Sequence, residues 1–133
     1  METRQIEAKS ILSKSGIGGI SYCVNPYVGC SHGCVYCYAS FMKRFTGHRE
    51  PWGSFVDVKV NAPQLLEKQT RKTRDGVIIL SSVTDPYQPA EARCRVTRGC
   101  LEALAGKPFR VEVLTKSPLV LRDIDLLKTF KNL

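Results

Sequence analysis

The stretch "GVIILSSV" at residues 76–83 decides the fold, because it is an apolar run that begins at a glycine and ends in polar residues. Such a continuous run is typical of a parallel strand that is covered on both faces. A helical pattern precedes it, with Asn61 as the expected N-cap and Pro63 in the first turn, and another follows at 90–107. The sequence around this stretch therefore predicts alternating strands and helices.

The same alternation extends towards both ends of the chain. Further strands are expected at "GISYCVN" (19–25), "FVDVKVN" (55–61) and "FRVEVLT" (109–115). Further helices are expected at "VYCYASFMKRF" (35–45) and from Ser117 and Pro118 onwards. The helix at 90–107 has an apolar stripe and ends at Gly106; the stripe consists of Val96, Cys100, Leu101 and Leu104.

This pattern predicts an α/β fold built from strand–helix crossover units with a parallel sheet. Residues 1–133 would form one domain, in which residues 1–15 are a flexible N-terminal segment. Because chemistry in parallel sheets lies at the carboxyl ends of the strands, the loops there matter most. These are the cysteine-rich loop after 19–25, "SSVTDPYQPAE" (81–91) and "TKSP" (115–118), and we expect all three on one face.

Composition is that of a globular domain, with 43% hydrophobic and 24% charged residues among 133. The chain starts without a signal-peptide pattern and has no apolar run long enough for a membrane span, so we expect a cytoplasmic protein without membrane contact. The formal charge of +8 favours a polyanionic partner such as nucleic acid. Because Lys and Arg are spread along the chain, a merely solvated basic surface is the alternative.

Three of the six cysteines cluster in "GCSHGCVYCYA" (29–39), at Cys30, Cys34 and Cys37. A structural zinc site needs four tetrahedral ligands, and the expected second pair is missing, since Cys94 and Cys100 lie on different sides of a predicted helix. Three cysteines in a short loop can instead bind three irons of a four-iron cube and leave the fourth iron open. We interpret the other three as small buried hydrophobic residues: Cys23, Cys94 and Cys100.

The motif Cys30-x3-Cys34-x2-Cys37, placed after the first strand of an alternating fold, resembles the signature of the radical S-adenosylmethionine (SAM) superfamily. This resemblance implies a [4Fe–4S] cluster on the three cysteines and SAM bound at the open iron. It also implies reductive cleavage of SAM to a 5'-deoxyadenosyl radical, which abstracts hydrogen from a substrate. An electron donor such as flavodoxin or ferredoxin would then be a partner.

Four segments resemble the spore photoproduct lyase-like branch, also described as DNA repair photolyase-like. They are "NPYVGCSHGCVYCYA" (25–39), "VKVNAP" (58–63), "SSVTDPYQPAE" (81–91) and "LTKSPLVLRDIDLL" (114–127). The resemblance implies a partial (β/α)6 radical SAM barrel, of which residues 1–133 would be the first three βα units. A truncated domain of this kind is expected to bind cofactor weakly, to self-associate, or to need a partner that supplies the missing barrel half.

The same resemblance assigns roles to several residues. Tyr36 and Tyr38 would contact the cofactor, with packing under the loop as the alternative for each. Ser82 and Lys116 would hold the methionine end of SAM, in place of the Gly-Gly-Glu that many superfamily members have. Lys116 could pair with the carboxylate, or be solvated. Asp85 would contact cofactor or substrate, or cap the following helix.

Glu91 is expected to cap that helix rather than to bind a ligand. Spore photoproduct lyases themselves have a hydrogen-donating cysteine where this chain has Leu80. Because leucine has no transferable hydrogen, the resemblance predicts a substrate other than the spore lesion, with nucleic acid still a candidate class.

Two classes of function follow. The first is a radical SAM enzyme of the lyase-like branch. The second is a non-catalytic module that holds an iron–sulfur cluster or zinc and binds nucleic acid through its basic surface.

Overall fold

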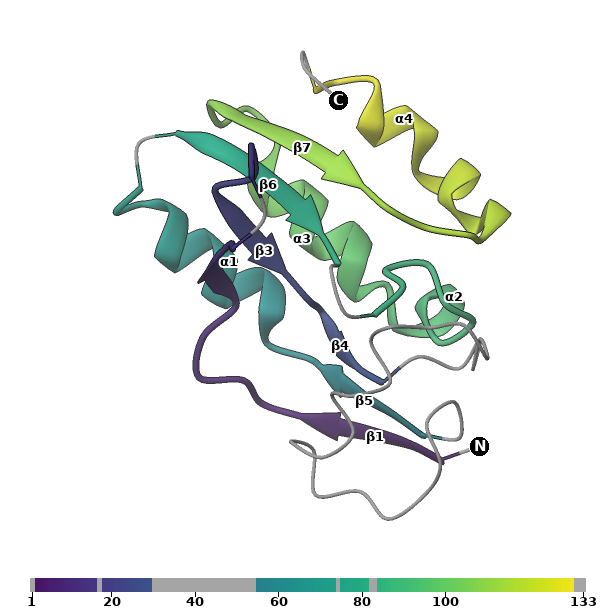
Figure 1. The fold of residues 1–133 in the computed structure, drawn as a ribbon. Helices are drawn as coiled ribbons and strands as arrows, with labels where there is room; N and C mark the ends of the chain where they lie inside the picture. The colour runs from purple at the N-terminus through teal and green to yellow at the C-terminus, as the bar shows by residue number, and fades with distance from the viewer. Residues whose placement is uncertain (1, 17, 30–54, 74, 82–83, 131–133) are drawn as a thin grey trace.

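The computed structural model describes residues 2–16, 18–29, 55–73, 75–81 and 84–130 (Figure 1). The expected helix at 35–45 lies outside these residues. The described elements are β1 (Glu2–Ile6), β2 (Leu12–Lys14), β3 (Tyr22–Val24), β4 (Tyr27–Val28), β5 (Phe55–Lys59), α1 (Ala62–Thr70), β6 (Gly76–Leu80), α2 (Glu91–Cys94), α3 (Val96–Leu104), β7 (Phe109–Val113), a 3-10 helix η2 (Pro118–Asp123) and α4 (Ile124–Leu127).

The described strands form two open sheets. The first has the order β2-β3-β6-β7, in which β3, β6 and β7 run parallel and β2 is antiparallel to β3. The second has the order β1-β5-β4, in which β1 is parallel and β4 antiparallel to β5. The α/β class and the parallel arrangement of β3, β6 and β7 are thus confirmed, and within the described residues the sheets are mixed rather than purely parallel.

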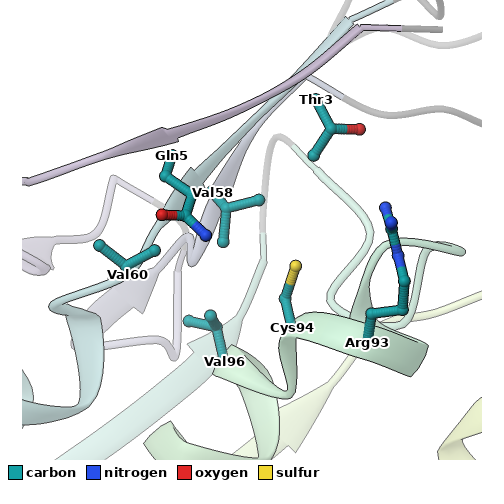
Figure 2. Close-up of a pocket in the computed structure, with 7 residues that line it drawn as sticks. All are labelled: Thr3, Gln5, Val58, Val60, Arg93, Cys94 and Val96. Atoms are coloured by element: carbon teal, nitrogen blue, oxygen red, sulfur yellow. The ribbon is translucent and has the colours of Figure 1, made fainter.

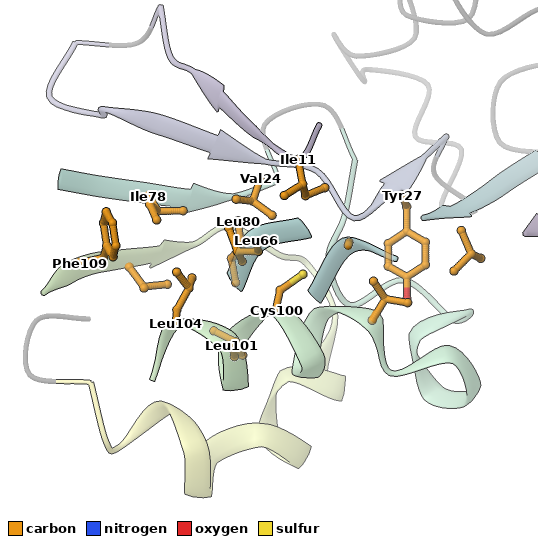
Figure 3. Close-up of a cluster of buried hydrophobic side chains, with 14 of the residues drawn as sticks. Ile11, Val24, Tyr27, Leu66, Ile78, Leu80, Cys100, Leu101, Leu104 and Phe109 are labelled. Carbon is orange, nitrogen blue, oxygen red and sulfur yellow. The ribbon is translucent and has the colours of Figure 1, made fainter. Parts of the chain in front are cut away.

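The core lies between the sheets and the helices α1 and α3, which lie side by side on one face (Figure 1). Ile78 and Leu80 of β6 are fully buried in this layer, together with the expected stripe of α3 (Figure 3). Val77 and Ile79, on the other face of β6, are only half-buried. The expectation that β6 is covered on both faces was therefore wrong, because complete burial is found on the helix side alone.

Residues 1–15, for which we expected a flexible segment, contain β1 and β2. The segment between these strands is held against α1 by two amide side chains. Asn61 accepts from Ala8 N (2.8 Å) and donates to Ala8 O (2.9 Å), while Gln69 Oε1 accepts from the backbone N–H groups of Ile11 (3.0 Å) and Leu12 (2.9 Å). Asn61 occupies the N-cap position of α1 without a side-chain cap bond, so its expected capping role was wrong.

The helix expected at 90–107 is divided into α2 and α3 at Arg95. Arg95 has left-handed backbone angles (φ 53°, ψ 29°), which end α2 and start α3 in a new direction. The carboxylate of Glu91 then accepts the N–H groups of Thr97 (2.8 Å) and Arg98 (3.2 Å), in the first turn of α3. Glu91 is therefore the helix cap that we expected, although it caps α3 from across the break.

The last expected helix is a 3-10 turn followed by one α-helical turn. Ser117 caps it, since its hydroxyl accepts the N–H of Leu119 at 3.2 Å. Gly106 follows α3 with a positive φ of 81°, as expected for the residue after a helix end. In the described part of the chain, no helix is both long and apolar enough to cross a membrane.

The left-handed conformation of Arg95 provides a test of the helix break. Replacing Arg95 by Gly should stabilise the fold by about 0.5 kcal/mol, because glycine adopts positive φ without the side-chain penalty. Arg95→Ala should leave the free energy of unfolding lower than that of Arg95→Gly, and chemical denaturation measures both. Equal stabilities for the two variants would contradict a left-handed residue at this position.

Candidate functional site

The loops that follow β3, β6 and β7 meet at one edge of the sheet. β3, β6 and β7 are parallel neighbours, so their carboxyl ends point the same way. The chain leaves β6 at Ser81, whose N–H is bonded to Val24 O of β3 at 2.7 Å. The expectation that three loops share one face is confirmed for the described parts of these loops.

Gly29 fixes the start of the cysteine motif. Its φ is +89°, and a Cβ there would lie 2.5 Å from the carbonyl oxygen of Phe55 and 2.9 Å from its ring. The carbonyl of Gly29 accepts from Thr84 Oγ1 at 2.5 Å and from the buried Gln88 Nε2 at 3.2 Å. The residue directly before Cys30 is therefore held between the start of β5 and the loop after β6.

Asp85 joins the loop after β6 to the loop after β7. Its buried carboxylate accepts from Tyr87 N (2.8 Å), Thr115 Oγ1 (2.5 Å) and Lys116 N (3.1 Å). These bonds position the backbone of Lys116, a residue that is exposed at this edge. The structure thus brings Asp85 and Lys116 together, and it gives Asp85 a bracing role that the sequence did not indicate.

Ser81 has two unusual features at the end of β6. Its φ is 73°, a left-handed conformation that non-glycine residues seldom adopt. The residue is 1% exposed, and its hydroxyl has no hydrogen-bond partner among the described residues. Strained backbone and unpaired buried polar groups concentrate at functional sites. The sequence offered no signal for Ser81 beyond its place after an apolar strand.

A buried network of charged groups lies beneath these loops. Glu91, fully buried, accepts hydrogen bonds from the hydroxyl of Tyr27 and from Arg122 Nη2 (2.8 Å). Arg122 and Arg98 both pair at 2.8 Å with Asp123. Asp123 also accepts a hydrogen bond from the hydroxyl of Tyr87 at 2.9 Å, which links the loop after β6 to η2. The network ties β4, α3 and η2 together under the site.

These contacts shift several pKa values. Burial alone would raise the pKa of Asp123, but hydrogen bonds from Arg122, Arg98 and Tyr87 lower it below its usual range. Burial and the neighbouring carboxylate of Glu91 raise the pKa of Tyr27, so its hydroxyl stays a proton donor. Asp123 is therefore held ionised between two guanidinium groups, and the phenol of Tyr27 nearby stays neutral.

Most of the expected cofactor residues lie outside the described residues: Cys30, Cys34, Cys37, Tyr36, Tyr38 and Ser82. Within the described ranges, no group of three or more His, Cys, Asp or Glu side chains could hold a metal ion. Cys23 and Cys100 are buried free thiols, as expected. Burial, then the nearby Glu91, raise the pKa of Cys100 to about 12, which makes this thiol unreactive.

Cys94 differs from these two, because it is half-exposed and lines a pocket of about 530 Å³ between β1, β5 and the α2–α3 break. Figure 2 shows its sulfur pointing into the pocket from the helix side, with Arg93 beside it. Cys94, expected to be a small buried residue, is thus only partly buried: it packs against the core and also borders this pocket.

Comparisons with known proteins found relatives without a described function. The chain is 41% identical over 133 residues to the uncharacterized protein MJ0683 of Methanocaldococcus jannaschii, covering all of this chain and 49% of that protein. It is 37% identical over 111 residues to the uncharacterized protein Rv2578c of Mycobacterium tuberculosis, covering 80% of this chain and 32% of that protein. The uncharacterized protein ORF301 of Acidianus two-tailed virus is 31% identical over 119 residues, with coverages of 84% and 39%.

The chain therefore spans about half, or less, of the length of these curated relatives. No protein-family model matches it, and no solved structure matches it.

The close approach at Gly29 gives a testable consequence. Gly29→Ala should lower the free energy of unfolding by about 2 kcal/mol or more, for two reasons. The new methyl group would clash with the backbone carbonyl of Phe55, and alanine is strained at this positive φ. Gly106→Ala is the matched control, since Gly106 also has positive φ (81°) but nothing within 4 Å of its Cβ position. Its loss should be about 1 kcal/mol, from conformation alone. Denaturant titration compares them, and equal losses would contradict the packing at Gly29.

The lowered pKa of Asp123 gives a pH dependence. A carboxyl group with a lower pKa in the folded state stabilises the fold above its unfolded pKa of about 3.9, and that contribution is lost as pH falls through the folded pKa. Asp123→Asn should cost about 1.5 to 3 kcal/mol at pH 7, because Arg122 and Arg98 each lose a charge-assisted hydrogen bond to a buried carboxylate. It should also make unfolding free energy depend less on pH below 4. The exposed Asp75→Asn serves as control, and an Asp123→Asn curve parallel to that of the unsubstituted protein would refute the assignment.

Proposed function

We propose that this chain carries the N-terminal part of a radical SAM enzyme of the spore photoproduct lyase-like branch. The observation that supports this best is the anchoring of Gly29, the residue before Cys30, at the edge where the loops after β3, β6 and β7 meet. A cluster-binding loop that starts there would begin at the edge where α/β enzymes carry out chemistry.

The donor set fits an iron–sulfur cluster by its chemistry. Thiolates are the usual ligands of such clusters, and Cys30, Cys34 and Cys37 would supply three of them. The described residues offer no fourth ligand in a group suited to a metal. When bound, a reduced cluster with an open iron supplies the electron that cleaves SAM. Free thiolates also require a reducing compartment, for which we propose the cytoplasm.

The chain's own residues would bind and orient the cofactor. Asp85 holds the backbone N–H of Lys116 at 3.1 Å, so the ammonium group extends from a braced loop rather than from a free one. We propose that this ammonium pairs with the SAM carboxylate, with Ser82 beside it and with Tyr36 and Tyr38 near the cluster. The buried hydroxyl of Ser81 provides a further polar group at the same edge.

The proposal does not extend to repair of the spore lesion. Leu80 stands where the lyases have a hydrogen-donating cysteine, and its side chain is fully buried in the core (Figure 3). The natural substrate would therefore be a different molecule, and in the full-length relatives other segments would contribute to its pocket.

Anaerobic reconstitution with iron and sulfide tests the metal site. We expect about four irons per chain, and loss of the cluster in Cys30→Ala, Cys34→Ala and Cys37→Ala. Cys94→Ala and Cys100→Ala are matched controls that should keep it. One tightly bound zinc in place of iron, lost in Cys94→Ala, would instead indicate the non-catalytic metal module.

Equilibrium dialysis of SAM on the reconstituted protein tests the cofactor site. Lys116→Ala should weaken binding by roughly 1.5 to 3 kcal/mol, typical of a charge-assisted hydrogen bond, without loss of iron. Lys128→Ala, an exposed lysine on α4's C-terminal side, should have no effect. Unchanged SAM affinity in Lys116→Ala would show that Lys116 is a solvated surface residue that does not bind SAM.

A further inference from the structure

A second groove, of about 450 Å³, lies at the end of the sheet opposite to Gly29. It is formed where β2 and the first residue of β3 approach the last turn of α1. β3 runs from this groove towards Val24 and Gly29, so the two edges are separated by the length of the strands (Figure 1). Its polar lining is dominated by four lysines, namely Lys9, Lys14, Lys68 and Lys72.

The two walls of the groove are held at a fixed separation. Gln69 lies between them, accepts the N–H groups of Ile11 and Leu12 through Oε1, and donates to Ser10 Oγ at 3.0 Å. Asn61 makes two further bonds to Ala8 at the other end of α1. Lys9 and Lys14 therefore lie on a segment that is bonded to the helix carrying Lys68, so the backbones that carry these lysines keep a fixed separation.

The positive charge of the groove is uncompensated within the described residues. All four lysines are exposed, none forms an ion pair with another described residue, and no acidic side chain lines the groove. On a different side of α1, by contrast, Glu67 pairs with Lys107 at 2.8 Å and with Arg71 at 3.9 Å. Four ammonium groups gathered without a carboxylate create a local potential that attracts a polyanion.

An aromatic residue lies among the lysines. Tyr22, half-buried at the start of β3, lines the same groove. Lysines that contact phosphates, combined with an aromatic ring on which a base can stack, are the usual means of binding single-stranded nucleic acid. A flat anionic membrane surface would reach the lysines but not a ring inside a groove, so the combination favours a strand.

We propose that this groove binds a short stretch of single-stranded nucleic acid, with Lys9, Lys14, Lys68 and Lys72 on the phosphates and Tyr22 against a base. This site lies at the far edge of the sheet from Gly29 and does not rest on the radical SAM assignment. It gives a defined location to the preference for polyanions that the net charge of +8 suggested only in general terms.

Fluorescence anisotropy with a labelled oligothymidylate of about 12 nucleotides tests the site, over a range of salt concentrations. The variant with Lys9, Lys14, Lys68 and Lys72 all changed to Gln should bind at least tenfold more weakly at 0.1 M salt. Its slope of log K against log salt should be smaller by about 3, since each lost phosphate contact removes about 0.7 for a single strand. Tyr22→Leu should weaken binding about tenfold and leave the slope unchanged.

The control removes the same charge elsewhere, through Arg93→Gln, Arg95→Gln, Arg110→Gln and Lys128→Gln, all at exposed positions. It should keep most of the affinity, and circular dichroism should show every variant folded. Equal weakening in the control would mean that binding depends on the total charge of the protein and not on the groove, and would overturn the proposal. Unaltered binding in the lysine variant or in Tyr22→Leu would overturn it too, as would binding to phosphatidylserine vesicles without binding to the oligonucleotide.

Discussion

The arrangement of the site depends on the hydrogen bonds and the ion pair that the buried carboxylate of Glu91 makes. This carboxylate accepts hydrogen bonds from Tyr27 of β4, from the first turn of α3 and from Arg122 of η2, so one side chain joins three elements that are distant in the sequence. A buried charge is tolerated only when it is paired and fully hydrogen-bonded. Removing Arg122 would leave this carboxylate without its cationic partner, and removing Tyr27 would take away one of its hydrogen bonds, so the elements depend on one another.

On this foundation, short polar contacts assemble the loops at the carboxyl edge. Gly29 permits a backbone approach to Phe55 that no other residue allows, and its carbonyl is held by Thr84 and Gln88. Asp85 extends the same assembly to the loop of Lys116. The opposite edge is built differently, with an amide clamp at Gln69 and uncompensated lysines. The proposed catalytic and nucleic-acid functions would thus occupy separate ends of one sheet.

The elements that the sequence predicted are those with local signals. Residues 76–80 of the apolar run form β6, residues 55–59 of the alternating "FVDVKVN" form β5, and a helix begins after Ser117 as expected. The elements that it missed depend on distant partners. β1 is a strand because it pairs with β5, more than fifty residues later. No local pattern records such contacts.

The same distinction holds for the candidate site. The convergence of three loops was predictable from parallel topology, and Lys116 and Asp85 lie there. The bracing by Asp85, the strain at Ser81 and the role of Gly29 were not predictable, because they arise from tertiary contacts at the edge. The lysines of the groove were scattered in the sequence, and only the pairing of β2 with β3 beside α1 gathers them.

The most direct test of the central claim is electron paramagnetic resonance of the reconstituted, reduced chain with and without SAM. If three cysteines at this edge hold a cluster with one open iron, the reduced protein should give an iron–sulfur signal whose line shape changes when SAM is added. A signal that SAM leaves unchanged, or no iron–sulfur signal from a protein that retains zinc, would contradict the account.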